Sequence, residues 1–135
     1  MTPEEVDAFL REPLIADLAT LRPDGSPHVA PVWFHYDGQS LKVVSQKKSV
    51  KVRNIRHDPR VSVSIPTPSK PYKYVKFDGT ATISFDEIPE LTRSMAVRYM
   101  GQVEGERYAG RILQELDFCL ITVTPSKILG WSDEE

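Results

Sequence analysis

The chain has 135 residues, a single cysteine and a formal net charge of −2. Its length fits one domain over residues 1–135. One cysteine cannot form an internal disulfide or a cysteine-based zinc site, and the negative net charge argues against a nucleic-acid binder. Because no run is long enough to span a bilayer and residues 1–11 lack the apolar stretch of a signal peptide, we expect a cytoplasmic protein without a membrane partner.

The first third of the chain predicts one helix and three strands. Thr2 is a typical helix cap before Pro3, and the stripe of Val6, Phe9 and Leu10 continues the helix. Turn residues at 23–26 and 37–38 separate strands that we expect over residues 14–21, 28–36 and 41–45. Pro31 within the second of these strands indicates a sheet edge, a bulge or a break that faces a ligand.

The remainder predicts a barrel closed by further strands and helices. We expect helices near 47–59, at 86–100 with Asp86 as the cap, and at 104–116, with 101–105 as a loop. Strands are expected at 60–65, at 72–84 with a bulge at Asp78-Gly79, and at 118–124, where Pro125 stops the strand and Cys119 is buried. Residues 128–131 add a short extension. This order predicts a mostly β protein, a small barrel of about six antiparallel strands with peripheral helices.

Positive charge is concentrated between Lys47 and Arg60. This segment holds six of the 17 Lys and Arg residues and one of the 19 Asp and Glu residues, so it carries +5. A short helix is expected to begin there after a strand, and helix N-termini bind phosphate through free N–H groups and the helix dipole. The alternative is a solvated helix whose Val52 and Ile55 face the core.

Side chains arranged for direct catalysis are missing from the sequence. The three histidines do not form a metal-ligand pattern, and the sequence contains no nucleophile elbow, P-loop or dinucleotide-binding glycine motif. A cofactor can carry the chemistry in such a protein. Four aromatic residues can stack on a ring system or pack in the core or an interface: Trp33, Tyr72, Tyr74 and Trp131.

Two motifs resemble the pyridoxamine 5′-phosphate oxidase-like superfamily. They are the hairpin over residues 18–34, with Ala-Thr-Leu-Arg-Pro-Asp-Gly-Ser-Pro, and the helix over 51–61, with Lys-Val-Arg-Asn-Ile-Arg-His-Asp-Pro-Arg-Val. The resemblance covers nearly the whole chain and is closest to the flavin/deazaflavin oxidoreductase branch, whose members often use coenzyme F-420. It implies an FMN-binding type of split β-barrel that works as a homodimer with cofactor sites at the interface.

The resemblance also implies where the cofactor phosphate lies. Lys51 and Arg53 would hold it, with Lys48, Ser49 and Val50 around them. Many relatives carry arginine where this chain has Ser49. Two alternatives follow: Lys47 or Lys48 compensates for the missing arginine, or the phosphate is held more weakly or in a different way.

The flavin-type ring is expected on the strands before the basic segment. By resemblance, the second strand would run beside the ring, the end of the third strand would flank it, and an aromatic loop would approach the cofactor or the substrate. The corresponding residues are Pro31, Val32 and Trp33, then Val44 and Ser45, then Tyr72 and Tyr74.

These expectations indicate an oxidoreductase. It would transfer a hydride between bound F-420 and a small planar unsaturated substrate, with no catalytic side chain and no metal of its own. FMN is the second candidate cofactor. The rival hypotheses are a flavoprotein or haem-binding protein without turnover and, least favoured, a nucleic-acid module that uses the basic helix.

Overall fold

The computed structural model describes residues 1–133 and contains four helices and seven strands in that range. In chain order they are α1 (Pro3–Leu10), β1 (Ala16–Leu21), β2 (Pro27–Val32), β3 (His35–Tyr36), β4 (Leu41–Gln46), α2 (Val50–His57), β5 (Arg60–Pro66), β6 (Lys73–Ser84), α3 (Ile88–Met100), α4 (Gln102–Glu115) and β7 (Phe118–Ser132).

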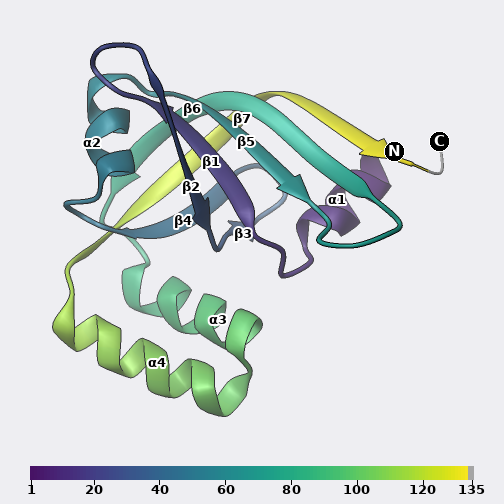
Figure 1. Cartoon of the computed structure of the whole chain (residues 1–135). Helices are drawn as coiled ribbons and strands as arrows, with labels where there is room; N and C mark the ends of the chain where they lie inside the picture. The colour runs from purple at the N-terminus through teal and green to yellow at the C-terminus, as the bar shows by residue number, and fades with distance from the viewer. Residues whose placement is uncertain (134–135) are drawn as a thin grey trace.

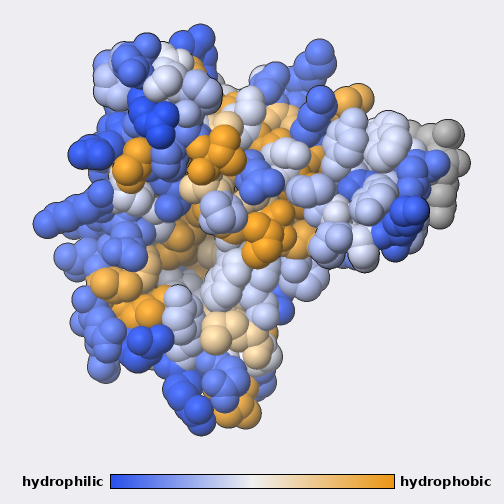
Figure 2. Space-filling view, viewed as in Figure 1, coloured by the Kyte–Doolittle hydropathy of each residue, from blue (hydrophilic) through white to orange (hydrophobic). Residues whose placement is uncertain are grey.

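All seven strands form one antiparallel sheet in the order β2-β1-β5-β6-β7-β4-β3. The sheet curls into a split β-barrel, with α2 at one end, α1 near the other and α3 and α4 as a separate hairpin (Figure 1). In the same view, Figure 2 shows a recess between the barrel and the hairpin with apolar residues along it. The predicted mostly β split barrel is confirmed, with seven strands in place of about six.

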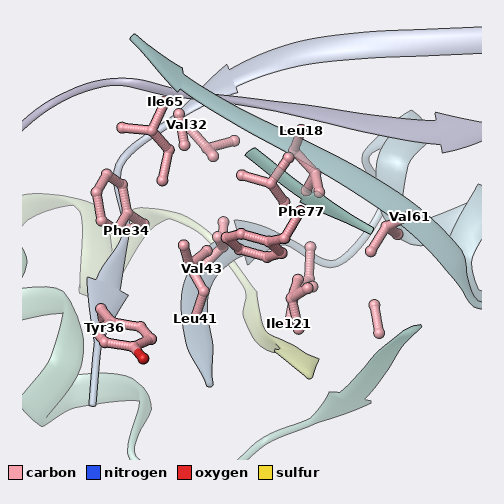
Figure 3. Close-up of a cluster of buried hydrophobic side chains, with 14 of the residues drawn as sticks. Leu18, Val32, Phe34, Tyr36, Leu41, Val43, Val61, Ile65, Phe77 and Ile121 are labelled. Carbon is pink, nitrogen blue, oxygen red and sulfur yellow. The ribbon is translucent and has the colours of Figure 1, made fainter. Parts of the chain in front are cut away.

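Alternate residues of the strands fill the barrel. Along β1 every second side chain is buried, beginning with Ala16 and Leu18, as expected for a strand with one face on a core. Figure 3 shows Leu18, Phe34 and Phe77 gathered in this interior. Burial of each large apolar side chain stabilises the fold by about 1.5–3 kcal/mol. Cys119 is also fully buried, as predicted.

The predicted second strand is divided into two. Residues 27–32 form β2 against β1, whereas 35–36 form β3 against β4, and these two strands are the opposite edges of the sheet. Phe34 lies between them and is completely buried, which requires the chain to turn into the core at that point. The expectation of an edge position for Pro31 is therefore confirmed, because proline in a sheet is tolerated where its missing N–H faces no partner.

The last strand does not stop at Pro125, contrary to prediction. β7 continues to Ser132, and its pairing with β6 shifts register between Asp78 and Gly79, where the predicted bulge is confirmed. A Cβ atom on Gly79 would lie 2.3 Å from the carbonyl oxygen of Thr124, so only glycine allows this approach. The bulge accommodates proline because the regular ladder is interrupted there.

The α3–α4 hairpin is tighter than its sequence predicts. Asp86 is not the cap of α3: that position belongs to Glu87, which has a φ of 57° and makes no capping hydrogen bond. The predicted loop over 101–105 is also wrong, because Gly101 alone, with a φ of 91°, separates the two helices. Gly105 lies inside α4, where a Cβ atom would be 2.5 Å from the backbone of Val97.

Local signals near the N-terminus act as predicted. Thr2 caps α1 and forms a capping box with Glu5, and Gly25 and Gly38 occupy turns with positive φ. None of the helices in residues 1–133 has the length and apolar character needed to cross a bilayer.

Candidate cofactor site

The end of β4 and the start of α2 form a turn rich in hydroxyl and cationic groups. Ser49 caps α2, and its Oγ accepts a hydrogen bond from the Val52 N–H at 3.4 Å. The Oγ atoms of Ser49 and buried Ser45 lie 3.0 Å apart. Val50 and Lys51 open the helix, so their N–H groups have no intrahelical acceptor. The predicted phosphate residues Ser49, Val50 and Lys51 are thus brought together in one turn, beside Ser45, which is expected to flank the ring.

Lys51 is the most distinctive cation of this turn. Its side chain is half-buried, and desolvation lowers the pKa of its ammonium group, although the nearby Cys119 thiol acts in the opposite direction. Within residues 1–133 no carboxylate pairs with it. A desolvated ammonium without a counter-ion is unfavourable, and an anion placed beside it would remove that cost. The turn therefore has the charge that a phosphate requires.

Other cations of the segment are exposed and lack acidic partners. Lys48 and Arg53 make no ion pair within the described residues, and Lys47 lies over the ring of Phe85 at 5.4 Å. Only Arg60 is paired, with Asp58 at 2.8 Å. We refer to Lys47, Lys48, Lys51 and Arg53, together with Ser45 and Ser49, as the basic turn.

The opposite side of α2 fixes the basic turn to the barrel. Val52 and Ile55 are buried, so the alternative expectation of a core stripe is confirmed, and it coexists with the unpaired cations. Asn54 is also buried and donates to the hydroxyl of Thr20 at 3.0 Å. Sequence analysis missed this anchor, since an asparagine among charged residues gives no sign of burial.

The three consecutive residues expected beside the ring face three directions. Pro31 is exposed on the edge strand, whereas the side chain of Val32 lies in the barrel core. Trp33 points under the hairpin, where its ring stacks on Tyr99 with centroids 4.8 Å apart and meets the edge of Tyr108 at 6.0 Å. Only Pro31 of the three is freely available to a cofactor in this structure.

Tyr72 and Tyr74 are not brought to the basic turn. Lys47 of this turn lies over the ring of Phe85, directly after β6 ends at Ser84, and the strand spans about 30 Å from there to Tyr74. Tyr74 stacks on Trp131 at 5.3 Å, and Tyr72 is 48% exposed beside them. One chain therefore divides the predicted site between two ends of the barrel.

A pocket that sequence analysis did not find lies next to Trp33 and Val44. It has a volume of about 140 Å³ and lies between the hairpin and the ends of β4 and β7. We call it the hairpin pocket. Tyr108 and Ile112 on α4 and Leu116 directly after it, spaced four residues apart, form one wall. That spacing was a signal of an apolar helix face, but it could not reveal what the face covers.

Comparison with solved structures supports the architecture over nearly the full chain. An F-420 reductase is 30% identical, with a TM-score of 0.74 over 91% of this chain and 94% of the reductase. A conserved hypothetical protein from Mycobacterium tuberculosis is 27% identical, with a TM-score of 0.79 over 98% of this chain and 85% of that one. The heme storage protein HutZ from Vibrio cholerae shares the fold at 20% identity, with a TM-score of 0.73 over 93% and 92% of the two chains.

The family assignment follows from the sequence itself. The two motifs that carry the resemblance form the antiparallel hairpin of β1 and β2 and the helix α2. A family model described as pyridoxamine 5′-phosphate oxidase matches residues 2–132. With almost all of its length matched, the chain belongs to the pyridoxamine 5′-phosphate oxidase family.

Proposed function

We propose that this protein is an oxidoreductase that binds F-420 and uses it to reduce a small planar unsaturated substrate. The observation that carries the proposal is Lys51, a half-buried cation at the start of α2 that has no acidic partner among residues 1–133. The 30% identity to an F-420 reductase over most of both chains favours F-420 over FMN.

The basic turn would hold the anionic part of the cofactor. Lys51, the Ser49 hydroxyl and the first N–H groups of α2 would bind the phosphate, and the exposed Lys48 and Arg53 would reach the acidic tail. When bound in its reduced form, F-420 supplies a hydride, and a solvent proton completes the saturation of the substrate double bond. The chain itself contributes binding, orientation and exclusion of water.

We further propose that the site is completed by a second copy of the chain. Tyr72 and Tyr74 are too far from the basic turn of their own chain, and a homodimer can present them to the turn of its partner. The outer face of the sheet supports this arrangement. It has a groove of about 590 Å³ and exposes the apolar side chains of Val29 and Leu129.

The proposal is tested by titrating the purified protein with F-420, FMN and haem in parallel, followed by fluorescence or absorbance. We expect F-420 to bind with micromolar or tighter affinity, and reduced F-420 to be reoxidised by an enone. Preference for FMN would move the protein to an FMN-dependent activity. Binding of haem, or of F-420 without turnover, would favour a carrier.

Mixed dimers test the second copy. We expect light scattering to show a dimer, and we expect Lys51→Ala and Tyr74→Ala chains, each defective alone, to recover one intact site per dimer when they are mixed. A monomer that binds F-420 as tightly as any dimer would contradict the shared site.

A further inference from the structure

The hairpin pocket has fixed walls. Trp33 contacts both Tyr99 and Tyr108, and the Tyr99 hydroxyl accepts from the Phe34 N–H at 3.2 Å and donates to the Leu14 carbonyl at 2.6 Å. The hairpin is thereby tied to the barrel on one side of the pocket. A pocket whose walls are already held in place binds a ligand with little loss of conformational entropy.

The interior of the pocket is mostly apolar. Val44 and Phe118 line it from the sheet, and Ile112 and buried Met95 line it from the two helices of the hairpin. Thr92 also lines the pocket, but its hydroxyl already donates to the Ile88 carbonyl at 2.6 Å. The interior thus favours a hydrocarbon surface and offers little to a charged or strongly hydrated group.

An uncommitted polar group stands at the rim, and the hydroxyl of Tyr108 is a second lining group without a hydrogen bond within residues 1–133. Gln46 lines the pocket and is exposed to solvent. Its side-chain amide makes no hydrogen bond within residues 1–133. An amide N–H₂ donates readily to a carbonyl oxygen. The pocket is therefore suited to an apolar body that carries one hydrogen-bond acceptor at its outer end.

Volume limits the size of that body. An engineered apolar cavity of about 150 Å³ in another protein binds benzene, and the hairpin pocket measures about 140 Å³. A single six-membered ring fits this space, whereas the three fused rings of a flavin or deazaflavin do not.

The pocket also adjoins the basic turn. Gln46 follows Ser45 directly and precedes Lys47, whose N–H donates to the Asp117 carbonyl at 3.0 Å. Val44 lines the pocket and is one of the residues expected to flank the cofactor ring. A molecule in the pocket would therefore lie beside a cofactor anchored at the basic turn.

We propose that the hairpin pocket binds a single six-membered ring and selects monocyclic conjugated ketones as substrates, with the ketone oxygen at the Gln46 amide. The binding of the ring rests on the pocket alone, and its role as substrate rests on the proposed function. In the reaction the reduced deazaflavin supplies a hydride to the β-carbon and solvent supplies a proton to the α-carbon, so that the enone becomes a saturated ketone.

Direct binding is measured without cofactor. Cyclohex-2-enone and toluene are titrated into the methyl-labelled protein and followed by NMR. We expect saturable shifts at the Met95 and Ile112 methyl groups and none at Met100 or Ile128, which are exposed elsewhere. The absence of a saturable shift at Met95 and Ile112 with either compound would overturn the proposal.

Two substitutions on α4 provide a matched pair. Ile112→Trp fills the pocket, whereas Val103→Trp places the same side chain at a position that is 68% exposed. We expect Ile112→Trp to weaken the binding of both compounds at least tenfold and Val103→Trp to leave it unchanged. Equal effects of the two substitutions would refute the site.

A third variant changes the rim of the pocket and leaves its interior as it is. Gln46→Leu removes the amide at an exposed rim position, so that folding is preserved. We expect weaker binding of cyclohex-2-enone with unchanged binding of toluene. Equal loss for the two compounds, or no loss for the enone, would contradict the assigned role of Gln46.

The test of the hairpin pocket can be distinguished from the test of the proposed function. We expect Ile112→Trp to bind F-420 like the unsubstituted protein while its KM for cyclohex-2-enone rises at least tenfold. If rings bind but F-420 does not, the pocket stands and the proposed function fails. If F-420 binds and rings do not, only the pocket is refuted.

Discussion

The basic turn and the hairpin pocket differ in what they offer a ligand: the first offers positive charge, and the second offers a small apolar volume. In the basic turn, cations such as Lys51 have no acidic partner in the part of the chain that the structure describes. The residues that form the turn lie within five positions of Ser49 in the sequence. In the hairpin pocket, apolar side chains from four separate elements enclose a small volume, with one amide at the rim. One region selects by charge and the other by shape and size, so each responds to a different perturbation.

Removal of the central cation is expected to have the largest effect on the charged region. Lys51→Ala should weaken F-420 binding about 10- to 100-fold, because a hydrogen bond to a charged group contributes about 1.5–3 kcal/mol. Fluorescence titration measures the change. Arg107→Ala, which removes an exposed cation on α4, serves as the control. An unchanged affinity of Lys51→Ala for F-420 would refute the assignment of the phosphate to the basic turn.

On the hairpin side, a single methyl group is expected to be costly. Gly105→Ala should destabilise the protein by about 1–3 kcal/mol, because the new Cβ would lie 2.5 Å from the Val97 backbone.

Gly110→Ala is the matched control on the same helix. No atom lies within 4 Å of its added Cβ. We therefore expect the substitution to stabilise α4 by up to about 1 kcal/mol. Thermal unfolding followed by circular dichroism distinguishes the two variants, and similar behaviour of both would show that the close approach of the helices is unimportant.

Salt should separate the two regions by a smaller, several-fold effect. Affinity for F-420 is expected to fall as ionic strength rises, since exposed charge pairs are screened over about 10 Å at 0.1 M salt. Binding of toluene should not weaken. Parallel titrations at low and high salt test this, and a salt-insensitive F-420 affinity would count against the basic turn as the anchor.

The smallest expected effect is on stability as a function of pH. Burial lowers the pKa of Lys51 below its ordinary value of 10.5. Between the lowered pKa and 10.5 the unfolded chain binds more protons at this residue than the folded chain, so the free energy of unfolding rises with pH in that window. Urea unfolding of the cofactor-free protein should show this rise relative to Lys51→Met, and parallel pH profiles would contradict it.

Whether a prediction was correct depended on how far along the chain its signal acts. Thr2 caps α1 and Asp78-Gly79 forms a bulge because both signals act over a few residues. Pro125 was misread as a strand end because the bulge opposite it, 46 positions away, removes the need for its N–H. Asp86 failed as a cap because α3 begins one residue later, with Glu87 in a left-handed conformation at the N-cap position.

The candidate site shows the same division. Ser45, Ser49 and Lys51 come together because strand, cap and helix follow one another in the chain. The directions of Val32 and Trp33 could not be predicted, since burial of Phe34 between two sheet edges decides them. The distance of Tyr74 from the basic turn likewise depends on the path of β6 through the barrel.

The amino-acid sequence alone determines those features of this protein that depend on residues close to one another in the chain. The charge of the basic turn, the hydroxyl cap of α2 and the alternation of the strands depend on neighbours within a few positions, and they suffice to indicate an anion site in a barrel. Tertiary packing alone determined the hairpin pocket, the burial of Asn54 and the separation of the tyrosines from the turn. These features arise from contacts between residues tens of positions apart, which a local pattern does not encode.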